Sequence, residues 1–472
     1  MAEESAATFE LTLNGERQIV DNAPTTTTLL DHLRQSGFVG TKEGCAEGDC
    51  GACTVAISAE DAGGEGQYQA VNSCLLPLAA AADRHIITVE GIARSELHPV
   101  QKAMVDGGGS QCGYCTPGFI MSLFAAYYAG NVDDRALEGN LCRCTGYLPI
   151  RRAAASLGRP AEDDPFTVTL DGLSPRLPER TYRYDGQAFF RPADLRSALQ
   201  LLQTYPKATL IAGATDLGVE INKHRRRFAT LISLEAVKEL QGVTETDGHL
   251  RIGAAVPLSH LESVCQGIFP ALDEMLRWFA ARQIRNRATL GGNLGTASPI
   301  GDLSPVLLAL DAEVEVAGPA GGRRIDIASF FTDYRQTALE PGEIIVGIHI
   351  PKTPPPGTAR RISRSYKVGK RGTDDISIVA AAFTVDLDEG GTVVQARLAY
   401  GGVAATPVRA EGVEAFLTGK EWTLETVSEA KTQLFEAFTP LSDLRGSAGY
   451  RRLLSGNLLE KFYQETRTEA DR

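Results

Sequence analysis

Three cysteines lie close together in the segment KEGCAEGDCGACTV. Cys45, Cys50 and Cys53 have the spacing C-x4-C-x2-C, and Cys74 follows in VNSCLLPL. Four thiolates with this spacing match a ligand pattern for a [2Fe-2S] cluster. Glycines between and beside the cysteines would let backbone N–H groups approach the sulfurs and tune the potential of such a cluster.

Zinc is the alternative metal at this position, and unrelated buried cysteines are a further alternative. Zinc sites usually present paired C-x2-C units, which differ from this loop. We therefore expect the four cysteines to bind iron and sulfide. The ninth cysteine of the chain, Cys265, stands alone, and we expect it to be a buried apolar thiol.

A second group comprises Cys112 and Cys115 in SQCGYCTPGFIM and Cys142 and Cys144 in GNLCRCTGY. Its spacing alone is compatible with zinc, with a redox dithiol or with a [2Fe-2S] cluster. The apolar segment FIMSLFAAYY predicts a helix after the first pair, and PIRRAAASLG predicts another after the second, with Gly158 as its C-cap. The group would therefore lie in loops between packed helices.

Composition and charge limit the classes of protein that fit. The chain has 472 residues, more than one hydrophobic core usually serves, so three or four domains are expected. Its net charge of −12 argues against a nucleic-acid partner. The segment MAEESAATFELTLNG lacks a signal-peptide pattern, and no apolar run approaches the roughly 20 residues that a membrane span needs. We expect a cytoplasmic protein with no membrane partner, where clustered cysteines bind metal or act in catalysis.

The elements before the first cysteine group are predicted by local signals. FELTL and ERQIV, joined by Asn14 and Gly15, predict a β-hairpin with a type I′ turn. TTTTLLDHLRQSG predicts a helix with hydroxyl N-caps and Gly37 as its stop signal. The hairpin, the helix and the cysteine loop together resemble the β-grasp fold of plant-type ferredoxins.

Two glycine turns follow a proline-rich stretch, residues 159–180, which we expect to be an extended tether. Gly213 and Gly218 lie in AGATDLG, and Gly291 and Gly292 lie in LGGNLG. Such turns can expose backbone amides to an anion, although either alone is also compatible with a simple tight turn. The chain has neither a Rossmann nor a Walker glycine pattern, so neither chemistry is indicated.

The second cysteine group carries a family resemblance. QCGYCTPGFIM and GNLCRCTGY resemble the helical [2Fe-2S] domain of the molybdenum hydroxylases, the xanthine dehydrogenase and aldehyde oxidase family. The resemblance implies that Cys112, Cys115, Cys142 and Cys144 bind a second [2Fe-2S] cluster. The two glycine turns are similar to the flavin-binding loops of the family's FAD domain, which folds like vanillyl-alcohol oxidase (PCMH-type).

The resemblance also implies a set of FAD-binding residues. The first turn would line the pyrophosphate and the second would form another cradle, while Asp302 would contact the polyol or sugar. Ile345 and Lys367 would approach the flavin ring. Ile252 stands where some relatives place an aromatic residue against the flavin, and Ala214 stands where relatives often have glycine or asparagine. The implied cofactor-binding residues are Leu210, Ile211, Ala212, Gly213, Ala214, Thr215, Asp216, Leu217, Ile252, Thr289, Leu290, Gly291, Gly292, Asn293, Asp302, Ile345 and Lys367.

The resemblance covers almost the whole chain and implies an α+β multidomain fold. The expected order is a β-grasp [2Fe-2S] ferredoxin domain, a helical-bundle [2Fe-2S] domain, a linker, the FAD domain and a small α/β C-terminal cap domain. The corresponding residues are 1–90, 91–160, 161–182, 183–352 and 358–472.

The expected cap domain contains a charged loop. In relatives this region lies near the nicotinamide site, so the loop would shape access for NAD, and a solvated loop is the alternative. The residues concerned are Lys370, Arg371, Asp374 and Asp375.

The function implied by the resemblance is that of the iron-sulfur and FAD subunit of a bacterial-type, two-subunit xanthine dehydrogenase. A large partner subunit with molybdopterin would hydroxylate hypoxanthine and xanthine to urate. Electrons would then pass through the helical-domain cluster, the ferredoxin-domain cluster and FAD to NAD+. No residue of this chain would act catalytically on the purine, and two heterodimers would pair.

Three alternatives remain open from the sequence. The same electron-transfer subunit could serve an aldehyde or N-heterocycle hydroxylase. The chain could also be a self-contained flavin-linked ferredoxin reductase. In another class, it could be a zinc-stabilised interaction module without a redox role.

Overall fold

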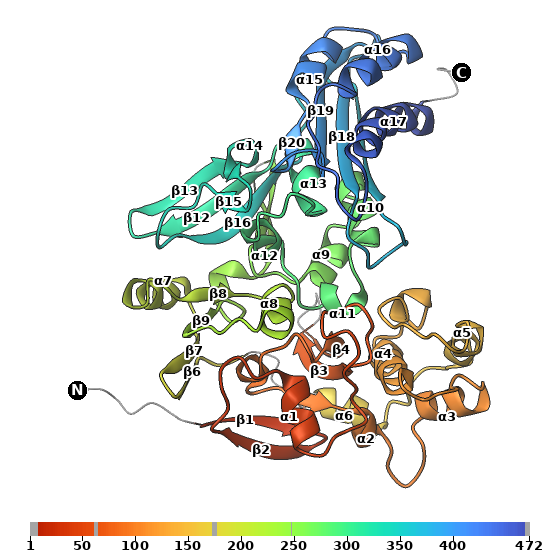
Figure 1. The fold of residues 1–472 in the computed structure, drawn as a ribbon, viewed down its shortest axis with the longest axis vertical. Coiled ribbons are helices and arrows are strands. Elements are labelled where there is room, and N and C mark those ends of the chain that lie inside the picture. The colour runs from red at the N-terminus through yellow and green to blue at the C-terminus, as the bar shows by residue number, and fades with distance from the viewer. Residues whose placement is uncertain (1–7, 61–64, 172–176, 247, 468–472) are drawn as a thin grey trace. The chain divides into compact units, whose positions relative to one another are not determined.

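The computed structural model describes residues 8–60, 65–171, 177–246 and 248–467, and Figure 1 traces the order of the helices and strands. The chain divides into two compact units. The first comprises Met1–Glu239, Pro257–His260 and Ala280–Thr289, and the second comprises Leu240–Val256, Leu261–Phe279 and Leu290–Arg472. Each unit contains sheets and helices, so the α+β multidomain prediction is confirmed.

A five-stranded sheet opens the first unit. Its strands are β1 (Thr8–Leu13), β2 (Glu16–Asp21), β3 (Thr54–Glu60), β4 (Gly66–Asn72) and β5 (His85–Ile87), in the order β2-β1-β5-β3-β4. The predicted hairpin is confirmed, because β1 pairs antiparallel with β2. Asn14 and Gly15 have φ values of 53° and 89°, the left-handed backbone that a type I′ turn needs.

Helix α1 (Leu29–Gln35) follows the hairpin. It begins after Thr28, whose hydroxyl accepts a hydrogen bond from the Asp31 N–H, while the Asp31 carboxylate accepts one from the Thr28 N–H. This reciprocal capping box confirms the predicted hydroxyl N-cap. The chain then turns at Gly37, whose φ is 89°, and enters the cysteine loop.

Helices surround the second cysteine group. They are α2 (Val89–Ile92), α3 (Pro99–Asp106), α4 (Thr116–Tyr128) and α5 (Leu148–Ala155), with a 3₁₀ turn at Asp134–Ala136; another 3₁₀ turn, Leu78–Ala81, packs in the core of the preceding sheet. Helix α4 is apolar on nearly all sides, and Phe119 and Leu123 are fully buried. Helix α5 confirms the predicted helix, but its C-cap is Ser156, so Gly158 lies beyond the helix and is not its cap.

Part of the expected extended tether is helical. Residues Pro165–Asp171 form α6. Phe166 is buried, and its ring centroid lies 5.1 Å from that of Phe124 and 6.4 Å from that of Tyr68. The Asp164 carboxylate accepts the Phe166 N–H at 2.9 Å. Burial of this one aromatic ring therefore holds the segment against the preceding domain.

A second sheet completes the first unit. Its strands are β6 (Arg180–Tyr184), β7 (Gln187–Arg191), β8 (Thr209–Ile211) and β9 (Thr230–Ser233), in the order β6-β7-β9-β8, with β7 and β8 both parallel to β9. Helices α7 (Leu195–Thr204) and α8 (Leu217–His224) accompany it, while α11 (Arg282–Arg285) packs against β4 of the first sheet. One core cluster contains Phe9 and Leu11 from the first sheet and Tyr182 and Phe189 from the second. The two sheets of this unit are therefore packed together.

Antiparallel sheets dominate the second unit. One has the order β10-β11-β16-β12-β13, another has β17-β18-β19-β20, and β14 pairs with β15. The strands are β10 (Val243–Thr246), β11 (His249–Gly253), β12 (Glu313–Gly318), β13 (Gly321–Asp326), β14 (Phe331–Asp333), β15 (Gln336–Thr337), β16 (Ile344–Pro351), β17 (Arg360–Val368), β18 (Val379–Leu387), β19 (Val393–Gly401) and β20 (Val408–Arg409).

The remaining helices pack mainly on these sheets. They are α9 (Leu258–Val264), α10 (Pro270–Trp278), α12 (Leu290–Gly295), α13 (Leu303–Ala309), α14 (Ile327–Phe330), α15 (Glu411–Leu417), α16 (Leu424–Leu434) and α17 (Ala448–Thr466), with a 3₁₀ turn at Lys238–Leu240. Figure 1 shows α15, α16 and α17 beside β18 and β19. Phe383, Tyr400 and Phe462 are fully buried in the core that these elements share.

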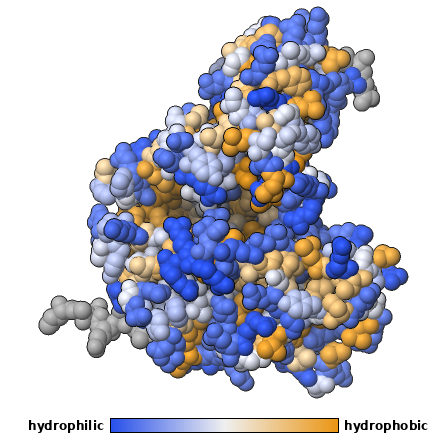
Figure 2. Space-filling model, in the orientation of Figure 1, coloured by the Kyte–Doolittle hydropathy of each residue, from blue (hydrophilic) through white to orange (hydrophobic). Residues whose placement is uncertain are grey.

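Figure 2 shows that the visible surface is largely hydrophilic, with hydrophobic patches between hydrophilic residues. Within the described ranges, no helix has both the length and the apolar character needed to cross a membrane.

Buried charges connect the two sheets of the first unit. The Glu235 carboxylate lies 2.8 Å from the guanidinium groups of Arg84 and Arg287. Asp83 is paired with the fully buried Arg191. Burial alone would raise the pKa of Glu235, but the positive charges of Arg287, Arg84 and Arg191 lower it to about 2. The network therefore depends on the ionised carboxylate.

We predict that Glu235→Gln lowers the free energy of unfolding by about 3–5 kcal/mol, because it leaves buried guanidinium groups without their counter-ion. The folded-state pKa lies below the ordinary value of 4.5, so the stabilisation is present above pH 4.5 and is lost as the pH falls toward 2. Urea unfolding across this range should show a smaller pH dependence for the variant than for the wild type. Glu16→Gln, at an exposed position of β2, is the control and should leave the curve unchanged. Equal curves for all three proteins would contradict the assignment.

Candidate functional site

The first cysteine group lies in the loop between α1 and β3 and in the turn after β4. Cys53 and Cys74 are buried, and their Sγ atoms are 3.3 Å apart. Cys45 and Cys50 are half-buried, and a hydrogen bond joins their thiols. The structure therefore brings the four predicted thiols together as two pairs within the first unit.

Amide groups surround these sulfurs. The Cys45 N–H donates to Cys50 Sγ at 3.2 Å. The N–H groups of Cys50 and Glu47 donate to Cys45 Sγ at 3.3 and 3.4 Å. The side-chain amide of Asn72 lies 3.8 Å from Cys53 Sγ. These donors favour the charged form of each sulfur.

In each pair the pKa of one thiol is lowered and that of the other is raised. The hydrogen bond from the Cys45 thiol, followed by that from the Ala52 N–H, lowers the pKa of Cys50 to about 6. The thiol of Cys74 likewise lowers the pKa of Cys53, while the pKa of Cys74 itself is raised. Thiolates are the metal-binding form of cysteine, so each pair offers one prepared ligand and one thiol that would release a proton on binding.

Two glycines make this arrangement sterically possible. A Cβ on Gly44 would lie 2.6 Å from Cys50 Sγ. Gly51 has a φ of +63°, and a Cβ there would lie 2.2 Å from the carbonyl oxygen of Gly139. Any side chain at these positions would occupy space that the sulfur or the neighbouring loop already fills.

The second cysteine group lies before α4 and before α5. Hydrogen bonds pair Cys112 with Cys144 and Cys115 with Cys142. Desolvation opposes ionisation of Cys142, but hydrogen bonds from the hydroxyl and N–H of Thr145 outweigh it and lower its pKa. Cys112 and Cys144 are exposed, so this group lies at the surface of the first unit.

Both groups have the donor set of a binuclear cluster. A [2Fe-2S] cluster uses four cysteine thiolates, and each group supplies four thiols in two pairs. The residues present therefore fit iron-sulfur clusters.

The first glycine turn, residues 210–217, runs from β8 into α8 in the first unit. Ala214 has a φ of +66°, in the left-handed region where glycine or asparagine is favoured. Gly213 has no room for a side chain, because a Cβ would lie 1.7 Å from the carbonyl oxygen of Arg287. The turn therefore lies directly against the segment that contains Arg287, a contact that local sequence signals did not reveal.

Helix α8 also contacts the first cysteine group. The Asn222 side-chain amide donates to the carbonyl oxygens of Cys74 at 2.7 Å and Ala46 at 3.0 Å. Gly218 lies against Leu75, whose carbonyl oxygen would be 2.5 Å from an added Cβ. The helix that begins at the predicted flavin turn thus touches the loops that hold the first four thiols.

The second glycine turn opens α12, directly after Thr289. Gly291 lies against Ala254, which leaves no room for a Cβ. Gly292 is exposed, and the Oδ1 atom of Asn293 is buried without a hydrogen-bond partner in the described part of the chain. An exposed backbone beside an unsatisfied acceptor fits a ligand with hydroxyl or N–H donors, which FAD has.

Asp302 is the centre of a buried polar group in the second unit. Its carboxylate accepts hydrogen bonds from Lys367 Nζ at 2.7 Å and Ser377 Oγ at 2.5 Å. The structure thus pairs two of the predicted FAD residues with each other. Ser377 was not predicted, because it lies far from Asp302 in sequence and no motif marks it.

The two predicted isoleucines lie within the sheet of the second unit. Ile345 is buried in β16. Ile252 is 0% exposed in β11, opposite Val243 on one side and Ile348 on the other. Its side chain offers no free surface in this state, so its predicted contact with a flavin stays a prediction.

The charged loop of the expected cap domain is held by Asp375. Its carboxylate accepts the backbone N–H groups of Lys370 and Arg371 at 2.7 and 2.8 Å. Lys370 Nζ donates to the carbonyl of Leu444 at 2.9 Å. Asp374 has a left-handed backbone, with a φ of 55°. The loop therefore has a defined conformation, and its predicted role in NAD access stays a prediction.

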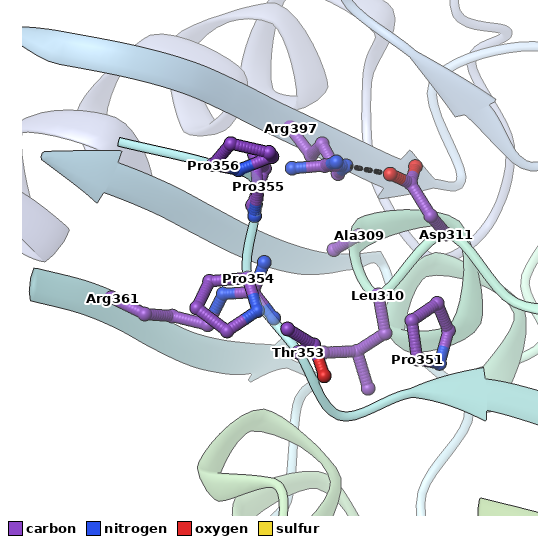
Figure 3. A pocket seen from close by; sticks show the side chains of 10 residues that line it. All are labelled: Ala309, Leu310, Asp311, Pro351, Thr353, Pro354, Pro355, Pro356, Arg361 and Arg397. Carbon is purple, nitrogen blue, oxygen red and sulfur yellow. Dashed lines mark hydrogen bonds and ion pairs between the residues drawn. The ribbon is translucent and has the colours of Figure 1, made fainter. Parts of the chain in front are cut away.

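A separate pocket of about 320 Å3 lies in the second unit beside the segment 351–356, as Figure 3 shows. Arg361 and Arg397 line it, and both are paired with carboxylates, Arg361 with Asp386 and Arg397 with Asp311. The cations are neutralised by these partners. No predicted site residue lines the pocket, and nothing in its chemistry selects a ligand.

Four protein families match successive parts of the chain. Residues 11–79 match the 2Fe-2S iron-sulfur cluster binding domain, and residues 88–155 match the [2Fe-2S] binding domain. Residues 182–353 match the FAD binding domain in molybdopterin dehydrogenase. Residues 364–466 match the CO dehydrogenase flavoprotein C-terminal domain.

Curated relatives include xanthine dehydrogenases. That of Emericella nidulans is 35% identical over 544 aligned positions, covering 100% of this chain and 39% of the relative. Xanthine dehydrogenase 1 of Arabidopsis thaliana is 32% identical, covering 96% of this chain and 39% of the relative. The chain thus spans about two fifths of the length of these relatives.

Solved structures also resemble the chain. A carbon monoxide dehydrogenase from Hydrogenophaga pseudoflava is 31% identical with a TM-score of 0.55, covering 58% of this chain and 94% of that one. Quinoline 2-oxidoreductase from Pseudomonas putida 86 is 27% identical with a TM-score of 0.55, covering 61% of this chain and 100% of that one.

We predict that Gly213→Ala lowers the flavin content of the purified protein at least severalfold. The added Cβ would collide with the Arg287 carbonyl, so either the turn or its support must move. Gly158→Ala is the matched control, because a Cβ there has nothing within 4 Å, and it should retain flavin. Flavin absorbance per protein chain measures the effect. Full flavin content in Gly213→Ala would show that the turn is not part of the cofactor site.

Proposed function

The chain belongs to the molybdenum hydroxylase family, and from this premise we propose that it is the electron-transfer part of such an enzyme, with two [2Fe-2S] clusters and FAD. The observation that carries the proposal is the gathering of eight cysteines into two groups of paired thiols in one unit. The first group also touches the helix that opens at the predicted flavin turn.

The exposure of the cysteines supports an order for electron transfer. The second group has exposed cysteines and would receive electrons at the surface. The Leu141 N–H donates to the carbonyl of Cys50 at 3.0 Å, which connects the second group to the first. Asn222 in turn connects Cys74 to α8. When bound, each cluster carries one electron and FAD exchanges one or two, so this order ends at the cofactor able to deliver a pair.

Each set of residues has a distinct task in this scheme. The eight cysteines would hold the clusters, and nearby amide donors would adjust their potentials. Residues 210–217 and Thr289–Asn293 would hold the FAD diphosphate and sugar through backbone N–H groups. Asp302 would contact the polyol or sugar of FAD, and its partner Lys367 would approach the flavin ring. No residue of this chain is assigned to chemistry on the substrate.

The source of electrons would be a molybdopterin center on a large partner subunit. A similar carbon monoxide dehydrogenase contains copper and molybdenum, and the matched relatives extend well beyond the length that this chain spans. The surface beside the second cysteine group suits docking, because Tyr114, Leu141, Tyr147 and Leu148 are exposed there. Association of two such heterodimers and a cytoplasmic location complete the proposal.

Xanthine is the first candidate substrate, because curated relatives across the chain are xanthine dehydrogenases. In that reaction the partner would hydroxylate hypoxanthine and then xanthine to urate with oxygen from water. Each step would release two electrons, which reduce NAD+ to NADH. Aromatic N-heterocycles are the second candidate class, because quinoline 2-oxidoreductase resembles this chain over the whole of its matched chain. The residues that distinguish these two substrate classes would lie on the partner subunit and not on this chain.

The composition of the copurified complex tests the proposal. We expect about four irons and one FAD per chain, with molybdenum on a second polypeptide. Xanthine should then reduce NAD+, whereas turnover of quinoline but not xanthine would favour the N-heterocycle alternative. Zinc in place of iron, without flavin, would refute the electron-transfer assignment and favour an interaction module.

We predict that Cys50→Ala removes the first cluster and leaves FAD and the second cluster in place, because the two cysteine groups are separate and the flavin turns lie outside both. Iron should fall from about four to about two atoms per chain, with one of two EPR signals lost. Cys265→Ala is the control, because Cys265 is buried and belongs to neither group, and it should keep both signals. Two normal signals in Cys50→Ala would contradict the ligand assignment.

A further inference from the structure

The peptide group between Gly51 and Ala52 is hydrogen-bonded on both sides. Its carbonyl oxygen, on Gly51, accepts from the N–H of Thr54 at 3.0 Å, from the Thr54 hydroxyl at 2.7 Å and from the side-chain amide of Asn140 at 3.1 Å. Its N–H, on Ala52, donates to the sulfur of Cys50. One peptide therefore connects Asn140 to a sulfur of the first cysteine group.

Asn140 comes from the loop of the second cysteine group, two residues before Cys142. Its side chain is buried, and its Oδ1 accepts hydrogen bonds from Ser122 Oγ at 2.6 Å and Gln283 Nε2 at 3.1 Å. These two donors orient the amide, so that its nitrogen is the atom that meets the Gly51 carbonyl. The geometry is thus determined by residues from three separate segments of the first unit.

Close packing keeps water away from this contact. A Cβ on Gly51 would lie 2.4 Å from Asn140 Nδ2. A Cβ on Gly118 would lie 2.2 Å from the Gly51 carbonyl oxygen. The contact is therefore built by direct approach of two loops, at positions where a larger residue than glycine would prevent it.

We infer that Asn140 is a positioning residue for the first cluster: through the peptide between Gly51 and Ala52, it strengthens the hydrogen bond to the Cys50 sulfur and raises the reduction potential of that cluster. The inference rests on the proposed function, since it requires the first group to hold a [2Fe-2S] cluster.

The direction of the effect follows from charge. A reduced cluster carries one more negative charge than an oxidised one, so a hydrogen-bond donor to its sulfur stabilises the reduced form more. A donor to the carbonyl of a peptide polarises that peptide and strengthens donation by its N–H. Asn140 thus acts in the same direction as Asn72, which donates directly to Cys53. A residue from the loop of the second cluster thereby adjusts the driving force for electrons that leave that cluster.

The test is an EPR-monitored redox titration of the purified complex and its Asn140→Ala and Asn140→Leu variants. Alanine leaves space, whereas leucine has the branching of asparagine with bulkier methyl groups that fill the site, and neither can donate to Gly51. Both variants should lower the equilibrium constant for one-electron reduction of the first cluster three- to tenfold. A tenfold change corresponds to 59 mV. The second cluster's potential and the flavin content should stay unchanged. The signal lost in Cys50→Ala identifies the first cluster.

Ser122→Ala is the matched control. It removes a buried hydroxyl from the other end of the same amide, while Gln283 still orients Asn140 toward Gly51. Its first-cluster potential should equal that of the wild type. An equal shift in Ser122→Ala, or shifts that differ in sign between the alanine and leucine variants, would show a packing effect and overturn the inference.

A spectroscopic readout covers the case in which the variants lose the first cluster. In the wild type, proton ENDOR before and after exchange into D2O should show a strongly coupled exchangeable-proton signal at the first cluster, because the N–H groups of Ala52 and Cys45 both donate to Cys50 Sγ. Its absence, or unchanged potentials in variants with about four irons, would overturn the inference and leave the proposed function standing. Absence of iron from the wild type would instead refute the proposed function.

Discussion

Repulsion among neighbouring sulfurs is the constraint on which the rest of the first unit depends. Thiolates gathered in a partly buried loop are costly unless nearby donors compensate their charge. The chain supplies these donors mostly from its backbone, with N–H groups of Cys45, Glu47 and Cys50 around the first group. A side chain at position 44 would collide with Cys50 Sγ, and one at position 51 would collide with the loop at Gly139 and Asn140, so close packing around the sulfurs accounts for both glycines.

The same packing makes a short later segment, residues 280–289, part of the iron-sulfur region. Gln283 donates to Asn140, the Asn286 side chain donates to the carbonyl of Ala70 at 2.9 Å, and Arg285 pairs with Glu138. Arg287 belongs to the buried ion network and also supports the first glycine turn through its carbonyl. The segment therefore contacts both the cysteine loops and the predicted flavin turn, so the position of one constrains the position of the other.

Sequence reasoning succeeded where the physical signal is local. Turn chemistry at Asn14-Gly15 and the cap at Thr28 predicted the first hairpin and helix, and cysteine spacing predicted which thiols meet. It failed where a distant partner decides. The proline content of the tether predicted an extended segment, but α6 forms there because Phe166 packs in an aromatic cluster. No local pattern marks Asn140 or Ser377, because their hydrogen-bond partners are 89 and 75 residues away in the sequence. Ligand roles carried by resemblance, such as that of Ile252, cannot be read from burial or spacing.

The path of the chain has a consequence for modularity. The stretch that matches a FAD binding domain, residues 182–353, does not lie in one compact unit, because the chain passes between the two units after residues 239, 256, 260, 279 and 289. A gene fragment cut at the borders of that match would take segment 280–289 away from the iron-sulfur loops it completes. Fusion, truncation or recombination at those borders would therefore disrupt the packing of both the iron-sulfur region and the flavin region. The two regions would have to be exchanged between such enzymes together.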